Sequence, residues 1–409
     1  MKEESFNHEE INKLINGAMK EEDAELTMLR SIFEKRLAGL NITPNQAVEN
    51  LGIEYRTLYG ILDGTLKRLD VLSLLKIAQF LEIPYNEITE PYLKAVSDKH
   101  INDLAEAKKR IFILNHFDLP VLKSINVIDS IRDFAHIEQQ LCSIFGISSI
   151  TEYNIEDTGA AFSSTKIKPK NDKSRKYFIK KSELIFELIQ NPHPYEKQAL
   201  IEYFPKIRWH STDVDNGILN VIRSLYILGI TVIFQPKMPS LQLRGATFAV
   251  NGKPCIVLTD YRESYPTLWF AFLHELFHVF FDWEEILKKC YHLSDEENDL
   301  FVVPQKEDEA NEFAREYLFP KQKMELISSR IEQRVFIKQF AIDNHVHPSI
   351  IYANYAYGNN NKDINLWAQF QKFMPPIKNL LKNLSNDLAH KLPASDFASY
   401  YKNNIFNKE

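Results

Sequence analysis

The chain has few cysteines and no long apolar run. Its 409 residues include three cysteines, and the spacing of Cys142, Cys255 and Cys290 pairs none of them. We therefore expect buried thiols rather than disulfides or metal ligands, as in a protein of the reducing cytosol. No apolar run is long enough to cross a bilayer, and residues 1–25 are acidic and polar rather than a signal sequence. A cytoplasmic protein with no membrane partner is expected.

The chain also has no excess of positive charge. It carries 49 Lys and Arg against 55 Asp and Glu, which gives a formal net charge of -6. This balance argues against a protein that coats nucleic acid along its whole surface. The hydrophobic content of 44% over 409 residues is enough for two or three packed domains.

The pentapeptide His274-Glu275-x-x-His278 lies inside an apolar, helix-length segment, residues 268–283. Residues four apart lie on one face of a helix, so His274 and His278 can hold one zinc ion. Glu275 lies one step round the helix, where it can reach a water on the open side of the metal and act as general base, then acid. The alternative is a buried helix whose histidines hydrogen-bond within the core, but ionisable groups in an apolar segment are costly without a partner.

A third ligand for the zinc is expected downstream, because catalytic zinc usually keeps three protein ligands. The acidic run 307–309 opens a helical segment that Pro320 ends. On that helix Glu307 falls about 50° from the centre of the apolar stripe, whereas Glu309 falls beyond roughly 100°. We therefore predict that Glu307 points inward and completes the zinc site. Asn311, one turn further on, could orient a ligand histidine.

Other interpretations of these acidic residues stay open. Glu309 is the second candidate for the third ligand. Glu284 lies six residues after His278, where a different class of zinc peptidase carries its third ligand, but that class needs a glycine turn and this chain has Phe281. A solvated first turn favoured by the helix dipole is the alternative for the run as a whole, and it describes Asp308 and Glu309 best.

The two motifs, in this order, carry a family resemblance. They comprise residues 272–279 around the pentapeptide and the pattern Glu307-x-x-Ala310-Asn311-x-Phe313-Ala314-x-x-x-Leu318-x-Pro320, with residues 228–232 and a hairpin upstream. Over roughly 206–330 the chain resembles the ImmA/IrrE family of zinc metallopeptidases. The family usually has glycine before the second histidine; Phe277 stands there in this chain and makes the pocket bulkier. Known members are intracellular and act on or beside helix-turn-helix repressors, so the resemblance implies a protein substrate such as a repressor or antitoxin.

The hairpin upstream is predicted from Asn251-Gly252, which separates two β-prone runs, 245–250 and 254–259. Asn-Gly between such runs is the strongest short signal for a hairpin. A strand beside the zinc helix could add a substrate peptide to the sheet, or the hairpin could be purely structural. The sequence leaves both interpretations open.

A helix-turn-helix is predicted near the N-terminus. Thr43, Pro44 and Gln46 form a capping box that starts a helix to Leu51, and Gly52 makes a tight turn into a second helix, 54–62. A third helix follows, with an apolar face made of Val71, Leu74, Leu75, Ala78 and Leu81. From Phe33 to Ile83 this pattern resembles the Xre-type repressor fold.

Whether this module binds DNA is a separate question. Its second helix would present Tyr55, Arg56, Thr57 and Tyr59 to a groove, with Lys67 and Arg68 near the phosphates. Over residues 27–95, however, basic and acidic side chains balance at eight each. A neutral module binds DNA weakly unless a homodimer or local polarisation strengthens it. Binding to promoter DNA and docking to a protein both stay open.

These observations predict a mainly α fold with a small β-sheet (α+β). The expected segments are an N-terminal tail (1–26), an Xre-like helix-turn-helix (27–95), a helical connecting region (96–205), an ImmA/IrrE-like zinc peptidase domain (206–330) and a C-terminal helical region (331–409). A basic stretch within the connecting region, 166–181, is predicted to be a solvated loop, with contact to nucleic acid or an acidic partner as the alternative.

The expected function is zinc-dependent cleavage of a protein, a repressor or antitoxin, in stress response, mobile-element control or phage defence. The alternative is a transcriptional regulator or antitoxin that uses the peptidase fold as a non-catalytic sensor or docking scaffold. A toxin restrained by a partner is a third interpretation.

Overall fold

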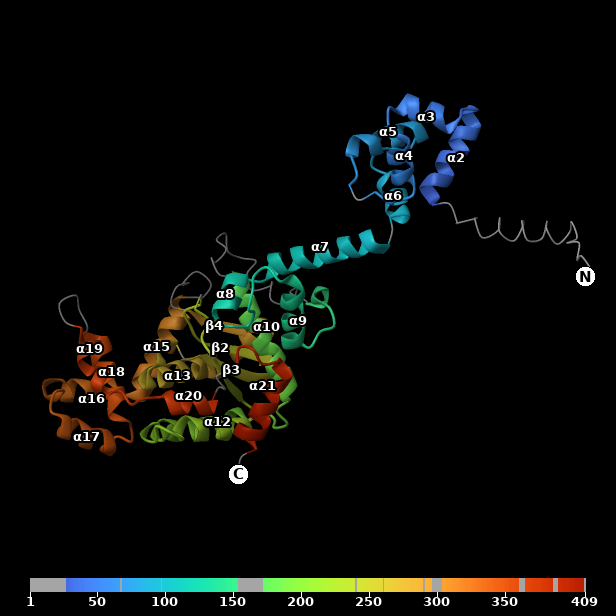
Figure 1. Cartoon of the computed structure of the whole chain (residues 1–409). Helices are drawn as coiled ribbons and strands as arrows, with labels where there is room; N and C mark the ends of the chain where they lie inside the picture. The colour runs from blue at the N-terminus through green and yellow to red at the C-terminus, as the bar shows by residue number, and fades with distance from the viewer. Residues whose placement is uncertain are drawn as a thin grey trace, which may run out of the picture. The chain divides into compact units, whose positions relative to one another are not determined.

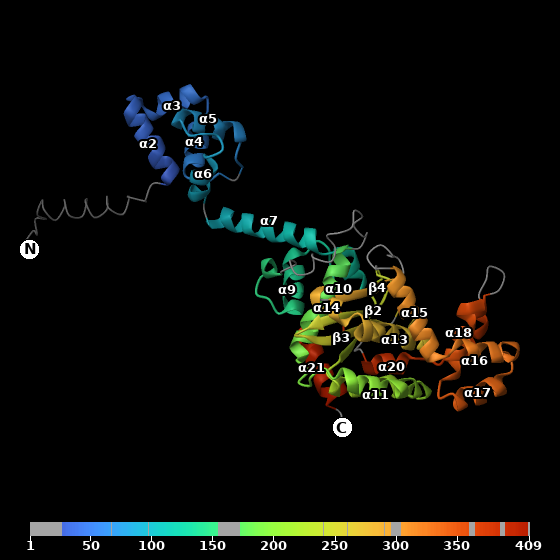
Figure 2. The same cartoon turned by 180° about the vertical axis from the view of Figure 1, so that it is seen from behind.

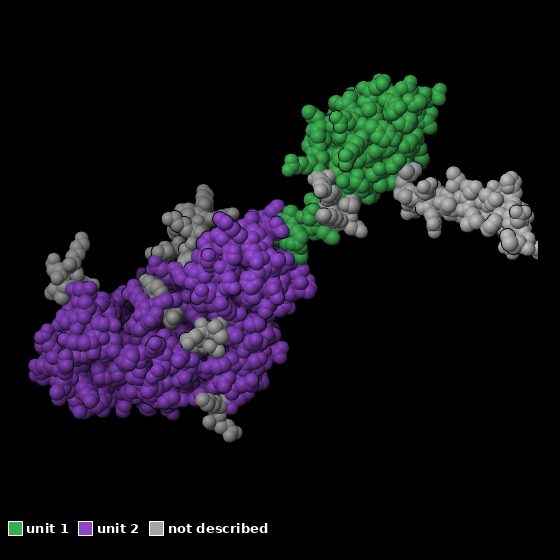
Figure 3. Space-filling view, viewed as in Figure 1, with its two compact units in different colours: residues 1–109 green, residues 110–409 purple. Residues whose placement is uncertain are grey.

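The computed structural model describes residues 27–66, 68–96, 98–153, 172–239, 241–259, 261–289, 291–295, 304–359, 365–384 and 389–407. The chain forms two compact units, residues 1–109 and 110–409 (Figure 3). Mainly α structure with one small β-sheet confirms the predicted fold class (Figure 1). The five predicted segments stay a prediction, and the expected tail, 1–26, lies outside the described residues.

The first unit is helical. Its elements are α2 (Met28–Leu40), α3 (Pro44–Leu51), α4 (Tyr55–Leu62), α5 (Val71–Leu81), α6 (Thr89–Ala95) and the start of α7 (Asp98–His116). Phe33, Leu58 and Ile77 lie fully buried at the centre of its core. Each of the three predicted helices is therefore present, and one apolar core holds them together.

Both ends of α3 have the capping residues that the sequence predicted. The Thr43 hydroxyl accepts from the backbone N–H of Gln46, and the Gln46 side chain accepts from the backbone N–H of Thr43, which completes the capping box. Gly52 ends α3 with a φ of 58°, a left-handed conformation that suits glycine. One detail was wrong: Val71 is 63% exposed, because it occupies the first turn of α5, before the stripe that reaches the core.

The second unit is built around a four-stranded sheet with the order β1-β3-β2-β4. The strands are β1 (Thr231–Gln235), β2 (Leu243–Val250), β3 (Lys253–Thr259) and β4 (Tyr291–Asp295). β1 runs parallel to β3, whereas β2 is antiparallel to both of its neighbours. The predicted hairpin is confirmed, since Asn251 and Gly252 join β2 to β3 with φ of 51° and 73°, as a type I′ turn requires. Both strands of the hairpin have a neighbour on each side, so an added peptide strand would have to pair with β1 or β4 instead.

Two of the helices that contact this sheet lie on its opposite faces (Figure 2). Alternate residues of a strand point to opposite faces. Gly245 and Thr247 of β2 meet α13 (Tyr265–Phe281), whereas the ring of Phe248 packs against that of Phe186 in α10 (Asp172–Ile189), with centroids 5.6 Å apart. The motif helix α13 therefore lies directly on the central strands.

The remaining helices surround this core. They are α8 (Leu119–Ser124), α9 (Phe134–Phe145), η1 (Ile150–Glu152), α11 (Lys197–Ile207), η3 (Arg208–Thr212), α12 (Gly217–Ile227), η4 (Tyr261–Glu263), α14 (Trp283–Lys289), α15 (Pro304–Leu318), α16 (Lys321–Ile327), η5 (Ser328–Arg330), α17 (Arg334–Asp343), α18 (Pro348–Asn359), α19 (Leu366–Phe370), η6 (Gln371–Phe373), α20 (Lys378–Leu384), α21 (Ala394–Tyr400) and η7 (Tyr401–Phe406). Within the described ranges, no helix is both long and apolar enough to cross a membrane.

The basic stretch was predicted wrongly where the structure describes it. From residue 172 onward it forms the first part of α10, and Lys181 is only 3% exposed. The Lys181 ammonium donates to the carbonyls of Ala389 and His390, at 2.8 and 3.0 Å, and burial lowers its pKa to about 7. These carbonyls lie 208 and 209 residues away in the chain, so local composition could not reveal them. The part of the stretch at 166–171 lies outside the described residues.

Two of the cysteines can be placed. Cys142 is half-buried and Cys255 is buried, and neither forms a disulfide. Burial raises the pKa of the Cys255 thiol well above its usual range. Both therefore agree with the expectation of thiols rather than disulfides, while Cys290 lies outside the described residues.

Candidate metal centre

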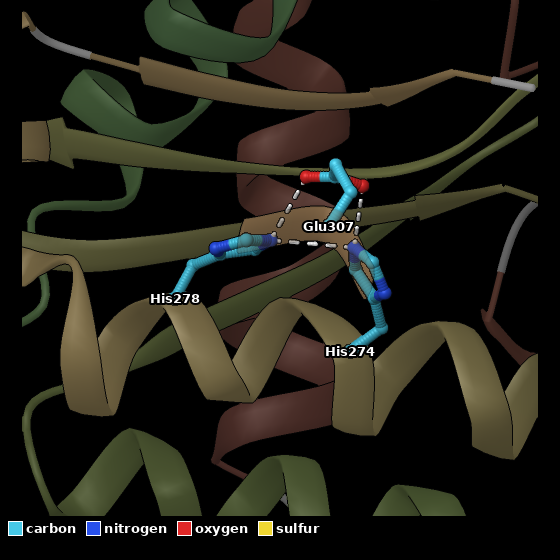
Figure 4. A group of neighbouring side chains, drawn as sticks. All are labelled: His274, His278 and Glu307. Atoms are coloured by element: carbon cyan, nitrogen blue, oxygen red, sulfur yellow. Dashed lines mark hydrogen bonds and ion pairs between the residues drawn. The ribbon is translucent and has the colours of Figure 1, made fainter. Parts of the chain in front are cut away.

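α13 presents both histidines of the pentapeptide on one face, as a spacing of four requires. The side chains are almost fully buried, and their Nε2 atoms lie 3.3 Å apart. Glu307, near the start of α15, spans the two rings: its Oε2 lies 3.1 Å from Nε2 of His274 and its Oε1 3.4 Å from Nε2 of His278 (Figure 4). Two helices thus bring three side chains to one point.

This group has the composition of a metal site. One ligand atom from each of His274, His278 and Glu307 lies within 4.8 Å of the other two. Imidazole nitrogen and carboxylate oxygen are the donors of catalytic zinc sites, where three protein ligands leave a fourth position open. Lone pairs that converge in a buried place are unfavourable unless a cation lies between them. The residues therefore fit a divalent metal ion.

Both imidazoles are held in place through their second nitrogen. Nδ1 of His274 lies 3.1 Å from Oδ1 of Asn311, and Nδ1 of His278 lies 2.8 Å from Oδ2 of Asp282. In a neutral imidazole, a proton on Nδ1 leaves the lone pair on Nε2, which is the atom that faces Glu307. Asn311 lies where the sequence placed it. Asp282 was missed, although it follows His278 by four residues and so shares its helix face.

The protonation of the His278 imidazole depends on the carboxylates beside it and on whether a metal ion is bound. Burial lowers its pKa, but hydrogen bonds to Asp282 and Glu307 outweigh burial and raise the pKa to about 9. Without a metal, His278 therefore binds a proton more tightly than an ordinary histidine does. Metal binding has to displace that proton, so metal affinity falls as the pH decreases.

Glu275 lies beside the three ligand residues without being one of them. It is fully buried, and its Oε2 accepts a hydrogen bond of 2.7 Å from the Thr247 hydroxyl on β2. Its Oε1 is buried with no hydrogen-bond partner among the described residues. A buried carboxylate oxygen in this state is costly, and a water molecule bound there would satisfy it.

Gly245 allows the strand to lie this close to Glu275. A Cβ atom at this position would stand 2.7 Å from Cγ and 2.8 Å from Oε1 of Glu275. Atoms of this kind do not approach so closely, so any side chain at Gly245 would displace the carboxylate. Thr247 and Gly245 were missed by the sequence reasoning, because a contact between a strand and a helix about thirty residues away leaves no local pattern.

The alternative ligands lie elsewhere. Glu309 and Glu284 are exposed, and neither belongs to the group of three. Phe277, which replaces the expected glycine, is 7% exposed and packs against Phe281 and Phe313, with ring centroids 4.7 and 5.4 Å away. Its bulk therefore fills the space between α13 and α15.

The residues suggested for DNA binding differ in their exposure to solvent. Those on the surface of the first unit are Tyr55, Arg56 and Arg68. Thr57 and Tyr59 are half-buried, and the Tyr59 ring packs edge-on against Phe33 with centroids 6.2 Å apart. Lys67 lies outside the described residues. On α4, Tyr55 and Arg56 are thus the side chains most open to a partner.

Comparison with known proteins agrees with the geometry. Residues 227–339 match the family model described as the IrrE N-terminal-like domain, Peptidase_M78. No curated protein and no solved structure gives a match. The matched stretch contains every residue of the group of three, together with Glu275, Gly245, Thr247, Asp282 and Asn311. The match supports a metallopeptidase domain of the IrrE/ImmA type within residues 227–339.

Proposed function

We propose that the chain is a zinc-dependent peptidase that cleaves another protein. The observation that carries the proposal is the convergence of His274, His278 and Glu307, with the buried Glu275 alongside. A histidine pair with a carboxylate and a neighbouring glutamate is the arrangement that peptide hydrolysis by zinc needs.

The residues divide into ligands and a proton carrier. His274, His278 and Glu307 hold the zinc, and Asn311 and Asp282 fix the direction of the two rings. A zinc ion supplies a Lewis acid that polarises the scissile carbonyl and makes water a usable nucleophile near pH 7. Glu275 takes the proton of the attacking water and then passes it to the leaving amine. The Thr247 hydroxyl holds one oxygen of Glu275 so that the other stays available.

The substrate that we propose is a repressor or an antitoxin. The support is the resemblance to the ImmA/IrrE family, together with the match of residues 227–339. Cleavage of such a protein would place the chain in stress response, mobile-element control or phage defence. The alternative is a regulator in which the same fold serves as a sensor or docking scaffold, and the buried Phe277 beside His278 is compatible with a narrowed cleft.

Metal removal tests the metal site. We expect about one zinc per chain in gently purified protein. Dialysis against a chelator should remove both the zinc and the cleavage activity, and added zinc should restore both. The double variant His274→Ala, His278→Ala provides the control for metal bound elsewhere. Zinc content equal to wild type in that variant would contradict the site.

We also propose that α4 contacts promoter DNA. The supporting observations are the capped α3, the turn at Gly52 and the exposed Arg56 on α4. Arg56→Ala should weaken binding to the chain's own promoter, and the affinity of wild type should fall steeply with salt. Lys35→Ala, an exposed charge on α2, is the matched control and should change binding less. Failure of wild-type protein to shift promoter DNA at low salt would favour protein docking instead.

A further inference from the structure

A pocket of about 270 Å³ lies beside the metal centre, lined in part by residues of α13, α15 and α18. Its walls include Phe270 and three arginines, Arg244, Arg262 and Arg315. We call it the arginine pocket. This volume is slightly below the ~300–1,000 Å³ of most ligand pockets, so the pocket suits one side chain better than a whole small molecule.

The arginine pocket is joined to the metal centre by shared residues. Asn311 lines the pocket, and the same amide holds Nδ1 of His274 at 3.1 Å. Phe270, one turn before His274 on α13, also lines the pocket, and its ring centroid lies 6.2 Å from that of His274. A peptide bound at the metal could therefore place a neighbouring side chain in this pocket.

Arg244 reaches the pocket because of an irregularity in β2. Leu243 of β2 pairs with Asp295 of β4, and Gly245 pairs with Ser294, so β2 has two steps where β4 has one. Arg244 is therefore the extra residue of a bulge. A bulge re-aims a side chain. The Arg244 guanidinium lies over the Phe270 ring, 5.7 Å from its centroid, and so on the α13 side of the sheet. Gly245, next in sequence, lies on Glu275, which links the pocket to the proton carrier as well.

The other two arginines approach from separate elements. The Arg315 guanidinium on α15 lies 4.5 Å from the centroid of the Tyr357 ring on α18, a contact that orients its plane. Arg262, in η4, has a φ of 64°, which is uncommon for a residue other than glycine. Three cationic side chains from three elements thus line one pocket.

The charge of the side chains that line the arginine pocket favours an anionic ligand. Among the described residues that line the pocket, none is acidic. Asn354 also lines it, and its Nδ2 is buried with no hydrogen-bond partner among the described residues. A buried amide donor beside guanidinium groups calls for an acceptor, and a carboxylate accepts in the planar, two-point geometry that arginine offers.

We propose that the arginine pocket is a specificity subsite that accepts an acidic side chain, Asp or Glu, of the peptide bound at the metal centre. The inference rests on the proposed peptidase function and narrows its substrate class to peptides with a carboxylate near the scissile bond. Arg244, Arg262 and Arg315 determine specificity; they do not take part in the bond cleavage.

The test uses the full-length, zinc-loaded Glu275→Gln protein, which binds peptides without cleaving them. The probe is a randomised peptide library with acetylated N-termini and amidated C-termini. Retained peptides should be enriched in Asp or Glu at one position, and adding Arg315→Gln should reduce that enrichment by about 10- to 100-fold. Arg334→Gln is the matched control, because Arg334 lies 4.5 Å from the Phe373 ring centroid but does not line the pocket. Thermal unfolding of each variant checks that the fold is kept, and Arg244→Gln provides a second, independent variant.

Three outcomes would overturn the proposal, and they differ in meaning. Retention without any acidic preference, or a preference that survives both Arg315→Gln and Arg244→Gln, removes the subsite but leaves the peptidase function standing. Retention only from a second library with free C-termini would show that the pocket takes a chain terminus rather than a side chain. If neither library is retained, the subsite and the proposed peptide binding fall together.

Discussion

Glu275→Gln is expected to lower cleavage of the substrate protein by about 10²- to 10⁴-fold while leaving the zinc content at the wild-type level. Glutamine has nearly the same shape, and its amide oxygen can still accept from the Thr247 hydroxyl, which donates to Glu275 at 2.7 Å. It cannot carry a proton from water to the leaving amine. Because Glu275 is not one of the three ligand residues, metal binding should be unaffected.

The same variant separates the peptidase from the regulator. Its cellular phenotype and its zinc content are measured together, with Glu284→Gln, an exposed glutamate on α14, as the control. A peptidase becomes inactive and still captures its target protein. A sensor or scaffold keeps wild-type behaviour, because metal, fold and surface are preserved. Full cellular activity with zinc bound would end the proposal of proteolysis.

Glu307→Ala should lose zinc, whereas Glu309→Ala should keep it. The Glu307 carboxylate reaches both Nε2 atoms, at 3.1 and 3.4 Å, and Glu309 is exposed two residues further on. Loss of an outer partner typically costs about 10- to 100-fold in metal affinity, and loss of a ligand should cost more. Competition with a chelator of known affinity gives the ranking, and Asp282→Ala should fall between the two variants. Zinc retained by Glu307→Ala and lost by Glu309→Ala would mean that α15 faces the site differently.

Helical periodicity was enough to anticipate the meeting of His274, His278 and Glu307. The two histidines share a face of α13 because they are four residues apart, and the apolar stripe of α15 fixed the direction of Glu307. Asp282 follows the same rule and could have been found in the same way. The hairpin turn and the capping box were also predictable, since each depends on residues adjacent in sequence.

Contacts between distant segments were beyond the reach of the sequence. Thr247 and Gly245 are close to Glu275 only because β2 packs on α13. Arg244 belongs to the arginine pocket only because β4 pairs with β2 with a shift in register. The burial of Lys181 depends on carbonyls near the C-terminus. In each case the determining partner is set by the tertiary structure, which a local pattern does not encode.

The contact between Gly245 and Glu275 limits how this protein can be engineered for stability. Replacing glycine by alanine in a strand usually stabilises a protein, by about 0.4–1 kcal/mol, because it restricts the unfolded chain. The backbone of Gly245 is not in the left-handed region, so conformation alone would permit the change. The methyl group would nevertheless meet the carboxylate of Glu275, to which we assign proton transfer. Consensus or thermostability designs should therefore treat Gly245 as part of the proposed active site, where a gain in stability would oppose the proposed activity.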